Sequence, residues 1–433
     1  NFMGFTAMGI ILIVMIGVGL AEMSGLIGAL IRKLVAVSSE AALTYIIVLL
    51  GVVSSIASDA GYLVLIPLGA AAFHSVGRHP LAGIAAAFAG VAAGFGVNFL
   101  ITPTDAILTE ITNEAIGLVD SGRTIDLTAN LYFGAISTVM ITIIASLITT
   151  RIVEPRLGAY DPSVAPDEDE AADATDADEP SEELQSKGLR WAGFATLGVI
   201  ALLAALTLPP GAPLRNPETG DIIGTSPFMD SLVVIISMIF LAAGVGYGRA
   251  VGKLSSLTEA IEAVTKSWAG LAGLLFLFLL IAQFIAFFNY SNVATVAAVQ
   301  LGDLLESASI GTIWLLIGVI LMTVIVNLII PQAIAKWALL APIFVPLFIR
   351  LGVEPQTVLA AYRIGDSPTN VITPIMAYFP LIVVFASRYD KNSGIGTVIA
   401  LMLPYALILT VVWLVLFASW YLLGIPLGPG SPV

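Results

Sequence analysis

Long apolar runs separated by short polar segments are the feature that most constrains the fold of this chain of 433 residues. A bilayer core of about 30 Å needs about 20 helical residues per crossing, and a helix satisfies its own backbone hydrogen bonds there. The runs therefore predict an all-α polytopic membrane protein. The candidate spans are 3–31, 80–98 with its continuation, 128–150, 189–208, 228–248, 268–290, 356–387 and 396–423. These are eight spans, and a helix before residue 1, which we expect because the chain starts apolar and without Met, would make nine.

The composition excludes several classes of protein. Charged residues make up 11% of the chain, whereas a soluble domain carries about 25%. A soluble enzyme, a nucleic-acid binder and a disordered protein are therefore excluded. With no cysteine and two histidines, the chain has neither a disulfide framework nor a recognisable metal-ligand cluster, and it has no phosphate-binding loop motif for ATP. We expect no cofactor, and membrane lipid as the immediate surroundings.

Most of the net charge of −13 lies in one segment. The stretch 161–183 contains eleven Asp and Glu and no Lys or Arg, which leaves −13 + 11 = −2 for the rest of the chain. It is rich in Ala and Pro and has no apolar period, so it is typical of a flexible, solvated linker. This divides the chain into a first membrane repeat at 1–154, an acidic cytoplasmic linker at 155–188 and a second membrane half at 189–433.

The basic residues near the span ends predict the orientation, because Lys and Arg favour the cytoplasmic side. All these clusters lie in the cytoplasm only if segments 41–76 and 309–350 each enter and leave on one side. Each segment has a polar interruption between two apolar limbs, which favours a re-entrant helical hairpin. A kinked crossing helix is the alternative. The basic residues are Arg32, Lys33, Arg151, Arg156, Lys187, Arg190, Arg249, Lys253, Lys266, Arg388 and Lys391.

The two hairpins are related in sequence. Residues 63–90 align with 338–365 at an offset of 275 with eight identities, among them Gly90 with Gly365. In each half the hairpin is followed by a helix that Gly and Pro interrupt, at 80–117 and at 356–387. The two hairpins open to opposite sides, so the chain is predicted to contain two inverted-topology repeats, the architecture of alternating-access transporters.

Polar side chains gather at the two helix breaks and at the hairpin tips. Arg363 and Asp366 are three positions apart and are expected to pair on one helix face, either as a functional ion pair or as a structural one. Half-helix N-termini favour anions and freed carbonyls favour cations, which suits an organic anion moved with or against H⁺ or Na⁺. Carboxylate and amide oxygens of Asp59, Asn98 and Asn370 offer a Na⁺ site. The second break also contains Ser367, Thr369, Asn370, Thr373 and Pro374, the first break Asn98, Thr102 and Asp105, the first tip Ser54, Ser55, Ser58 and Asp59, and the second tip Asn327, Gln332, Lys336 and Trp337.

Four stretches of the chain resemble the AbgT family of bacterial inner-membrane transporters: SDAGYLVLIP, NFLITPTDAILTEITNEA, RIVEPRLG and YRIGDSPTNVITPIMAYFPLI. The resemblance implies import of p-aminobenzoyl-glutamate, or export of sulfonamide antimetabolites and so antibiotic resistance. It also implies a homodimer, with nine spans and two hairpins per protomer, driven by the proton gradient. The route residues that it implies are Asp105, Asn327, Trp337, Pro355, Arg363, Asp366 and Pro374.

Three other functions remain open from the residues. A Na⁺-coupled carboxylate transporter of the wider ion-transporter superfamily would share the paired hairpins but have different tip residues. An ion channel would need a continuous polar lining, whereas this sequence has two discrete breaks. An intramembrane enzyme would need a nucleophile with its base or a metal site, and no His or Cys is placed for one. We therefore expect a transporter and no enzyme.

Overall fold

The computed structural model describes residues 6–57, 61–166, 180–223, 225–293, 296, 300 and 311–433, in which all regular secondary structure is helical apart from an isolated bridge between Gly428 and Ser431. The predicted all-α class is confirmed. Six described helices are long and apolar enough to cross a membrane: α1 (Thr6–Met23), α7 continued through α8 (Leu131–Leu157), α10 (Glu182–Thr207), α12 (Leu232–Ala250), α17 (Ala333–Arg350) and α20 (Ile395–Leu422). The pair α13 (Leu257–Ala269) and α14 (Ala272–Ser291), bent by 49° at a short break, adds a seventh if the two helices form one span. The count of eight or nine spans stays a prediction.

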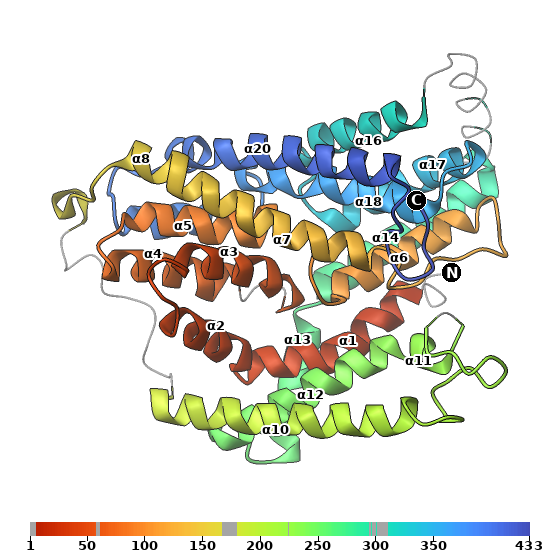
Figure 1. Ribbon diagram of the computed structural model, residues 1–433, viewed down its shortest axis with the longest axis horizontal. Coiled ribbons are helices and arrows are strands. Elements are labelled where there is room, and N and C mark those ends of the chain that lie inside the picture. The colour runs from red at the N-terminus through yellow and green to blue at the C-terminus, as the bar shows by residue number, and fades with distance from the viewer. Residues whose placement is uncertain are drawn as a thin grey trace.

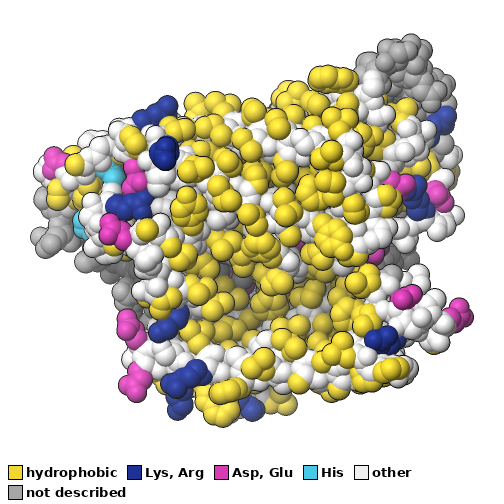
Figure 2. All heavy atoms as spheres, in the orientation of Figure 1, with side chains coloured by type: hydrophobic (Ala, Val, Ile, Leu, Met, Phe, Trp, Pro, Cys, Tyr) yellow, Lys and Arg dark blue, Asp and Glu magenta, His cyan; other side chains and the backbone are white. Residues whose placement is uncertain are grey.

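The surface of the molecule is divided as a bilayer requires. Figure 2 shows hydrophobic side chains over the middle of the visible face and charged side chains toward its two ends. Large apolar side chains are exposed along α10, where Phe194 is 65% exposed, and along α20, where Val411 is 61% exposed. Apolar surface of this extent is covered by lipid or by another protein rather than by water.

One layer of the fold consists of α1, α2 (Leu26–Ala36), α10 and α12, at the lower edge of Figure 1. α12 packs against both α1 and α10. The backbones of α1 and α12 approach so closely that a Cβ on Gly17 would lie 1.9 Å from the Ser237 carbonyl oxygen. The Ser237 hydroxyl donates to the Ile13 carbonyl at 2.7 Å, which fixes the same contact.

The predicted element bounds are wrong in two places. The expected span 3–31 is two helices, because α1 ends at Met23 and Gly25 has a φ of 84°, a left-handed conformation that favours glycine. α10 begins at Glu182, inside the predicted linker 155–188. The Ser181 hydroxyl accepts from the Leu184 N–H at 3.4 Å, and acidic residues follow in the first turn, so the helix starts where a cap is available. Residues 167–179 of the linker lie outside the described part.

The first predicted hairpin and broken helix form a connected series of short helices. They are α3 (Leu43–Val53), a 3₁₀ turn (Ser54–Ala57), a π-helical turn (Gly61–Leu65), α4 (Ile66–Ser75), α5 (Pro80–Phe88) with the π-helical turn η4 (Ala89–Ala93), and α6 (Pro103–Ile116). The chain is not helical between 97 and 102, where the expected break lies. A Cβ on Gly90 would lie 2.4 Å from the Val48 carbonyl oxygen, so η4 and α3 touch backbone to backbone.

The corresponding elements of the second half are α16 (Thr312–Asn327), α17, α18 (Pro355–Asp366), the 3₁₀ helix η7 (Pro368–Ile372) and α19 (Phe379–Ser387). Here a Cβ on Gly365 would lie 2.6 Å from the Ile320 carbonyl oxygen on α16. The repeat-paired glycines Gly90 and Gly365 thus make the same kind of close contact with the preceding apolar helix. The division into two inverted repeats remains a prediction, and this correspondence supports it.

Candidate functional site

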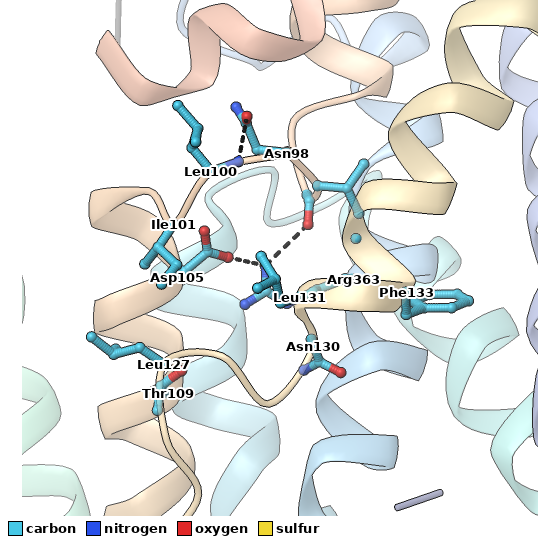
Figure 3. A pocket seen from close by; sticks show the side chains of 13 residues that line it. Asn98, Leu100, Ile101, Asp105, Thr109, Leu127, Asn130, Leu131, Phe133 and Arg363 are labelled. Carbon is cyan, nitrogen blue, oxygen red and sulfur yellow. Dashed lines mark hydrogen bonds and ion pairs between the residues drawn. The ribbon is translucent and has the colours of Figure 1, made fainter. Parts of the chain in front are cut away.

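The two helix breaks meet in the interior and are joined by an ion pair. Arg363 on α18 donates through Nη1 to Asp105 Oδ1 at 2.5 Å and to the Gly96 carbonyl oxygen at 3.0 Å (Figure 3). The predicted pairing of Arg363 with Asp366 is therefore wrong. Both lie on α18 at helical spacing, but the first turn of α6 brings a carboxylate to Arg363 from the other half, and Asp366 finds a different cation.

The start of α6 holds the Asp105 carboxylate in place. Oδ2 of Asp105 accepts from the Thr102 N–H at 2.7 Å and from the Thr102 hydroxyl at 2.8 Å. In return the Asp105 N–H donates to the Thr102 hydroxyl at 3.1 Å, which completes a capping box. One carboxylate oxygen thus caps the helix and the other faces Arg363, at a helix N-terminus that stabilises negative charge.

A second ion pair lies one turn further along α18. Lys336 Nζ is 2.6 Å from Asp366 Oδ1, and the two side chains are 0% and 3% exposed. Lys336 also donates to Asn327 Oδ1, and the Tyr362 hydroxyl lies 3.2 Å from Asp366 Oδ1. Lys336 is expected at the second hairpin tip but is absent from the route residues of the resemblance, and Tyr362 is not predicted at all. A lysine inside an apolar segment is itself the signal that could have identified this pair.

Amide side chains connect the second ion pair to the first half. Asn327 Nδ2 donates to the Thr369 hydroxyl and to Asn370 Oδ1, each at 2.8 Å. Asn370 Nδ2 donates in turn to the Ala92 carbonyl oxygen in η4, at 3.2 Å. The second hairpin, the second break and the first broken helix are thus linked by hydrogen bonds between buried groups, each of which has a partner.

Asn98 plays the corresponding part in the first break. Its Nδ2 donates to the Ser55 hydroxyl at 3.0 Å and to the carbonyl oxygens of Val52 and Val53, and its Oδ1 accepts from the Leu100 N–H. The Ser54 and Ser55 hydroxyls donate to carbonyls of α3. Ser58 and Asp59 lie outside the described residues. The Na⁺ site at Asp59, Asn98 and Asn370 therefore stays a prediction. In this structure Oδ1 of each asparagine accepts a hydrogen bond.

Two further residues of the second break bond back to their own helical turn. The Ser367 hydroxyl donates to the Arg363 carbonyl at 3.1 Å, and the Thr373 hydroxyl donates to the Thr369 carbonyl at 2.8 Å. Carbonyls that lack a helical partner at the break are in this way satisfied by side chains. Pro374 follows directly and is exposed.

Pro355 is the expected route residue that lies far from this cluster. It is buried at the first turn of α18, eleven positions before Asp366. At 1.5 Å per residue the two are about 16 Å apart along the helix. Pro355 therefore begins α18, where its fixed φ suits a first helical position, and the structure does not bring it to the ion pairs.

Trp337 is fully buried and has partners on both halves of the chain. Its indole N–H donates to the Thr112 hydroxyl on α6 at 3.0 Å. Its ring lies 4.4 Å from that of Tyr362, tilted by 31°. In this structure Tyr362 covers the aromatic face that was expected to meet a substrate ring.

A small cavity lies beside the Asp105–Arg363 pair. It measures about 30 Å³ and is lined by residues of the break between Gly96 and Ile101, by α6 and by the start of α7, with Asn130 and Arg363 both in its wall (Figure 3). Arg363 Nε and Asn130 Oδ1 are buried without a hydrogen-bond partner, one a donor and the other an acceptor. The volume suits water but not a drug-sized ligand, which needs about 300 Å³ or more. The site is thus closed around its own ion pair.

Among the described residues, no group of three or more His, Asp and Glu is placed to hold a metal ion. Helices of membrane length, two helix breaks that meet in the interior and ion pairs buried beside them define a multi-pass membrane transporter.

Comparison with known proteins places the chain within that class. Residues 1–433 match the model of the AbgT putative transporter family, and the chain belongs to this family. The p-aminobenzoyl-glutamate transport protein of Escherichia coli strain K12 is 36% identical over 430 residues, which are 99% of this chain and 82% of the relative. A bacterial inner membrane is consistent with that relative.

Two solved structures have the same fold. The Alcanivorax borkumensis YdaH transporter, described as having an unusual topology, is 42% identical, with a TM-score of 0.92 over 99% of this chain and 88% of that one. Neisseria gonorrhoeae MtrF, described as illuminating a class of antimetabolite efflux pumps, is also 42% identical, with a TM-score of 0.90 over 100% of this chain and 85% of that one. The predicted family and transporter class, and the absence of an enzymatic function, are confirmed.

Proposed function

We propose that this transporter moves an aromatic carboxylate of the p-aminobenzoyl-glutamate type by alternating access, driven by the proton gradient. The observation that carries the proposal is the Asp105–Arg363 pair, which joins the two helix breaks in the interior. A guanidinium binds a carboxylate through two parallel hydrogen bonds, so a substrate carboxylate competes with Asp105 for Arg363. Asp105, once displaced, is a group that can take the coupling proton. A Na⁺ gradient is the alternative driving force.

Export of sulfonamide antimetabolites is the second candidate. The aromatic pair Trp337 and Tyr362 beside the ion pairs supports it, because this pair offers a surface for the aniline ring that sulfonamides share with p-aminobenzoyl-glutamate. A ring that inserts there replaces one aromatic contact by another, whereas a glutamate moiety requires cations in addition. MtrF, whose description names antimetabolite efflux, supports this candidate.

We also propose that the hairpins at 41–76 and 309–350 open to opposite sides, in a homodimer. The matched contacts of Gly90 and Gly365 support the inverted repeat, and the family resemblance supports the dimer. The chain has no cysteine, so single cysteines can be labelled without background. Cysteines in place of Ser75 and Arg350, which are exposed at the ends of the two hairpins, should react with a membrane-impermeant maleimide from opposite sides. Labelling from one side would refute the inverted arrangement, and native mass spectrometry of the purified protein would test the dimer.

The transport proposal is tested in proteoliposomes that contain the full chain. Uptake of p-aminobenzoyl-glutamate and of a sulfonamide is measured under a proton gradient alone and under a Na⁺ gradient alone. We expect saturable movement of the carboxylate under the proton gradient, with counterflow of unlabelled substrate. Movement under the Na⁺ gradient alone would show that Na⁺, and not H⁺, is the coupling ion. Non-saturable flux would point to a channel.

A further inference from the structure

The buried charges of the site balance without a substrate. Asp105 and Asp366 each carry one negative charge, Arg363 and Lys336 each carry one positive charge, and each carboxylate faces one cation. A p-aminobenzoyl-glutamate molecule has two carboxylates. If it entered this site unchanged, two negative charges would be buried without counter-ions, which is strongly unfavourable.

We propose that Lys336 is the second anion-binding cation of the site, and that protonation of Asp366 releases its ammonium group to a substrate carboxylate. The proposal rests on the proposed substrate class. It assigns one substrate carboxylate to Arg363 and the other to Lys336. Each cation then exchanges its resident aspartate for a ligand carboxylate, and binding of the anion takes up protons.

The exchange balances in protons and charge. Before binding, the Asp366 carboxylate faces the Lys336 ammonium. Afterwards one proton from the aqueous side is bonded to an Asp366 oxygen, and the ammonium, which keeps its three protons, faces the substrate carboxylate. No covalent bond other than this O–H forms, and the ion pair bears no net charge before or after. The same exchange at Asp105 and Arg363 accounts for the second carboxylate.

The surroundings of Asp366 provide for its protonated form. The Tyr362 hydroxyl donates to the Ala333 carbonyl at 2.5 Å, which leaves the hydroxyl oxygen as an acceptor. That oxygen lies 3.2 Å from Asp366 Oδ1, so a protonated Asp366 has a hydrogen-bond acceptor already in place. A carboxylic acid without such an acceptor would be a buried donor without a partner.

The surroundings of Lys336 provide for its release. The ammonium donates to Asn327 Oδ1 as well as to Asp366, so it keeps one partner after Asp366 is protonated. Lysine has a flexible four-carbon stem and three donors, which allow it to change partners without rebuilding the helix. The Tyr362 ring centroid lies 6.0 Å from Nζ, and Trp337 packs against this ring, so an aromatic surface lies beside the same cation, which matches a ligand that joins a ring to a carboxylate.

Asp366 is the group through which protons can act on Lys336. Of the titratable and charged side chains on the elements that pack against α17, it is the one in direct contact with Nζ. The others are Tyr362 and Arg363 on α18, Asp105, Glu110 and Glu114 on α6, Tyr290 at the end of α14, and Arg350 on α17 itself.

The test is the number of protons taken up when the full chain binds its ligand in detergent, from calorimetry in buffers of different ionisation enthalpy. The probes are p-aminobenzoyl-glutamate, with two carboxylates, and p-aminobenzoate, with one. We expect the wild type to take up about two protons per p-aminobenzoyl-glutamate, one at Asp105 and one at Asp366. Lys336→Gln should take up about one, because only groups whose protonation changes on binding contribute, and without Lys336 the exchange at Asp366 no longer takes place. Asp366→Asn should also take up about one, since the ammonium is already released. Lys266→Gln, an exposed lysine on α13, is the matched control and should behave as the wild type.

Lys336→Gln could leave Asp366 as an unpaired buried charge and fail to fold. The double variant Lys336→Met/Asp366→Asn removes both charges together, a change that folded proteins tolerate far better. On binding p-aminobenzoyl-glutamate it should take up about one proton fewer than the wild type, as each single variant does. If a folded variant without Lys336 binds the dianion with wild-type affinity and wild-type proton uptake, the pair is structural and the inference is wrong. If the wild type binds neither probe, the proposed substrate class fails instead.

Discussion

Asp105 and Arg363 are 258 positions apart in the chain, and their side chains meet at 2.5 Å between the first and second helix breaks. Arg363 is almost wholly buried and Asp105 is partly exposed toward the small cavity. The pair therefore does two things at once. It neutralises a buried guanidinium, and it keeps that guanidinium beside a water-sized cavity that must widen before a competing anion can enter.

Replacing Arg363 should affect a dianionic substrate more than a sulfonamide. A charge-assisted hydrogen bond contributes about 1.5–3 kcal/mol, so Arg363→Ala should weaken apparent affinity for p-aminobenzoyl-glutamate by about 10- to 150-fold. A sulfonamide lacks the glutamate carboxylates and should lose less. Uptake of both into proteoliposomes measures the difference. Arg363→Lys is the control, because lysine keeps the positive charge but lacks the two parallel N–H donors of a guanidinium. Equal loss for both substrates would show that Arg363 acts in its ion pair and not on the substrate.

Asp366 should couple transport to protons. Asp366→Asn keeps the shape of the side chain but cannot exchange a proton, so substrate transport by this variant should depend less on the imposed pH gradient. The measurement is initial uptake at a series of pH gradients, with Asp390→Asn in the α19–α20 loop as a control at a distance. An unchanged dependence on the gradient would remove Asp366 from the coupling role.

Gly365 should be intolerant of any side chain. A Cβ there would lie 2.5 Å from Thr323 Cβ and 2.6 Å from the Ile320 carbonyl oxygen, and the latter is backbone that cannot rotate away. Gly365→Ala should therefore lower the free energy of unfolding by about 1–3 kcal/mol, as overpacking does. Gly318 has nothing within 4 Å of its hypothetical Cβ and is the matched control on α16. Melting curves in detergent compare the two, and equal melting temperatures would mean that α16 and α18 can separate at no cost.

His79 should make the stability of the fold at the start of α5 sensitive to acid. Burial lowers the pKa of His79 below its usual 6.5, which the carboxylates of Asp390 and Glu154 only partly oppose. Nδ1 accepts from the Leu81 N–H at 3.2 Å and caps α5. Between the lowered pKa and 6.5 the unfolded chain binds more protons than the folded chain, so this contribution to stability is lost as pH falls.

Thermal unfolding of the wild type and of His79→Asn tests this effect. Asparagine is also a good N-cap but does not titrate. The drop in melting temperature between about pH 7.5 and about pH 5.5, on the two sides of the ordinary histidine pKa, should be smaller in the variant. The same drop in both proteins would assign the acid sensitivity to other groups.

Local rules account for what could be predicted from the sequence. Apolar length predicts the helices, and Gly and Pro that cannot continue a helix predict the breaks near Thr102 and Pro368, where polar side chains then gather. The break at Gly25 was missed because a single glycine in an apolar run is common, and only its left-handed φ shows that the chain turns there. The start of α10 at Glu182 was not predicted because the acidic composition around it is typical of a linker, although Ser181 is a suitable N-cap.

Pairing between distant elements could not be predicted in this way. The helical spacing of Arg363 and Asp366 favours a pair between them, and the structure gives each a partner on another helix. Nothing in the local sequence indicates that α6 brings a carboxylate to Arg363 or that α17 brings Lys336 to Asp366. The same holds for the Tyr362 ring, which covers Trp337 by virtue of how α17 and α18 pack.

Trp337 and Trp413 offer a matched pair for separating function from stability. Both are fully buried, and each indole N–H donates to a hydroxyl at 3.0 Å, Thr112 for the first and Ser137 for the second. Phenylalanine at either position keeps a ring but loses the hydrogen bond and part of the volume, which lowers the free energy of unfolding by about 1–3 kcal/mol in each case.

Because Trp337 packs against Tyr362 beside Lys336, we expect Trp337→Phe to weaken substrate affinity by up to about 10-fold, since the smaller ring keeps part of a stacking contact that contributes about 0.5–1.5 kcal/mol. Trp413→Phe should leave affinity unchanged and lower stability alone. Ligand binding and melting curves are measured on both variants in one detergent. If both lose stability equally and neither loses affinity, the aromatic pair at α17 and α18 is packing, and the substrate ring binds elsewhere.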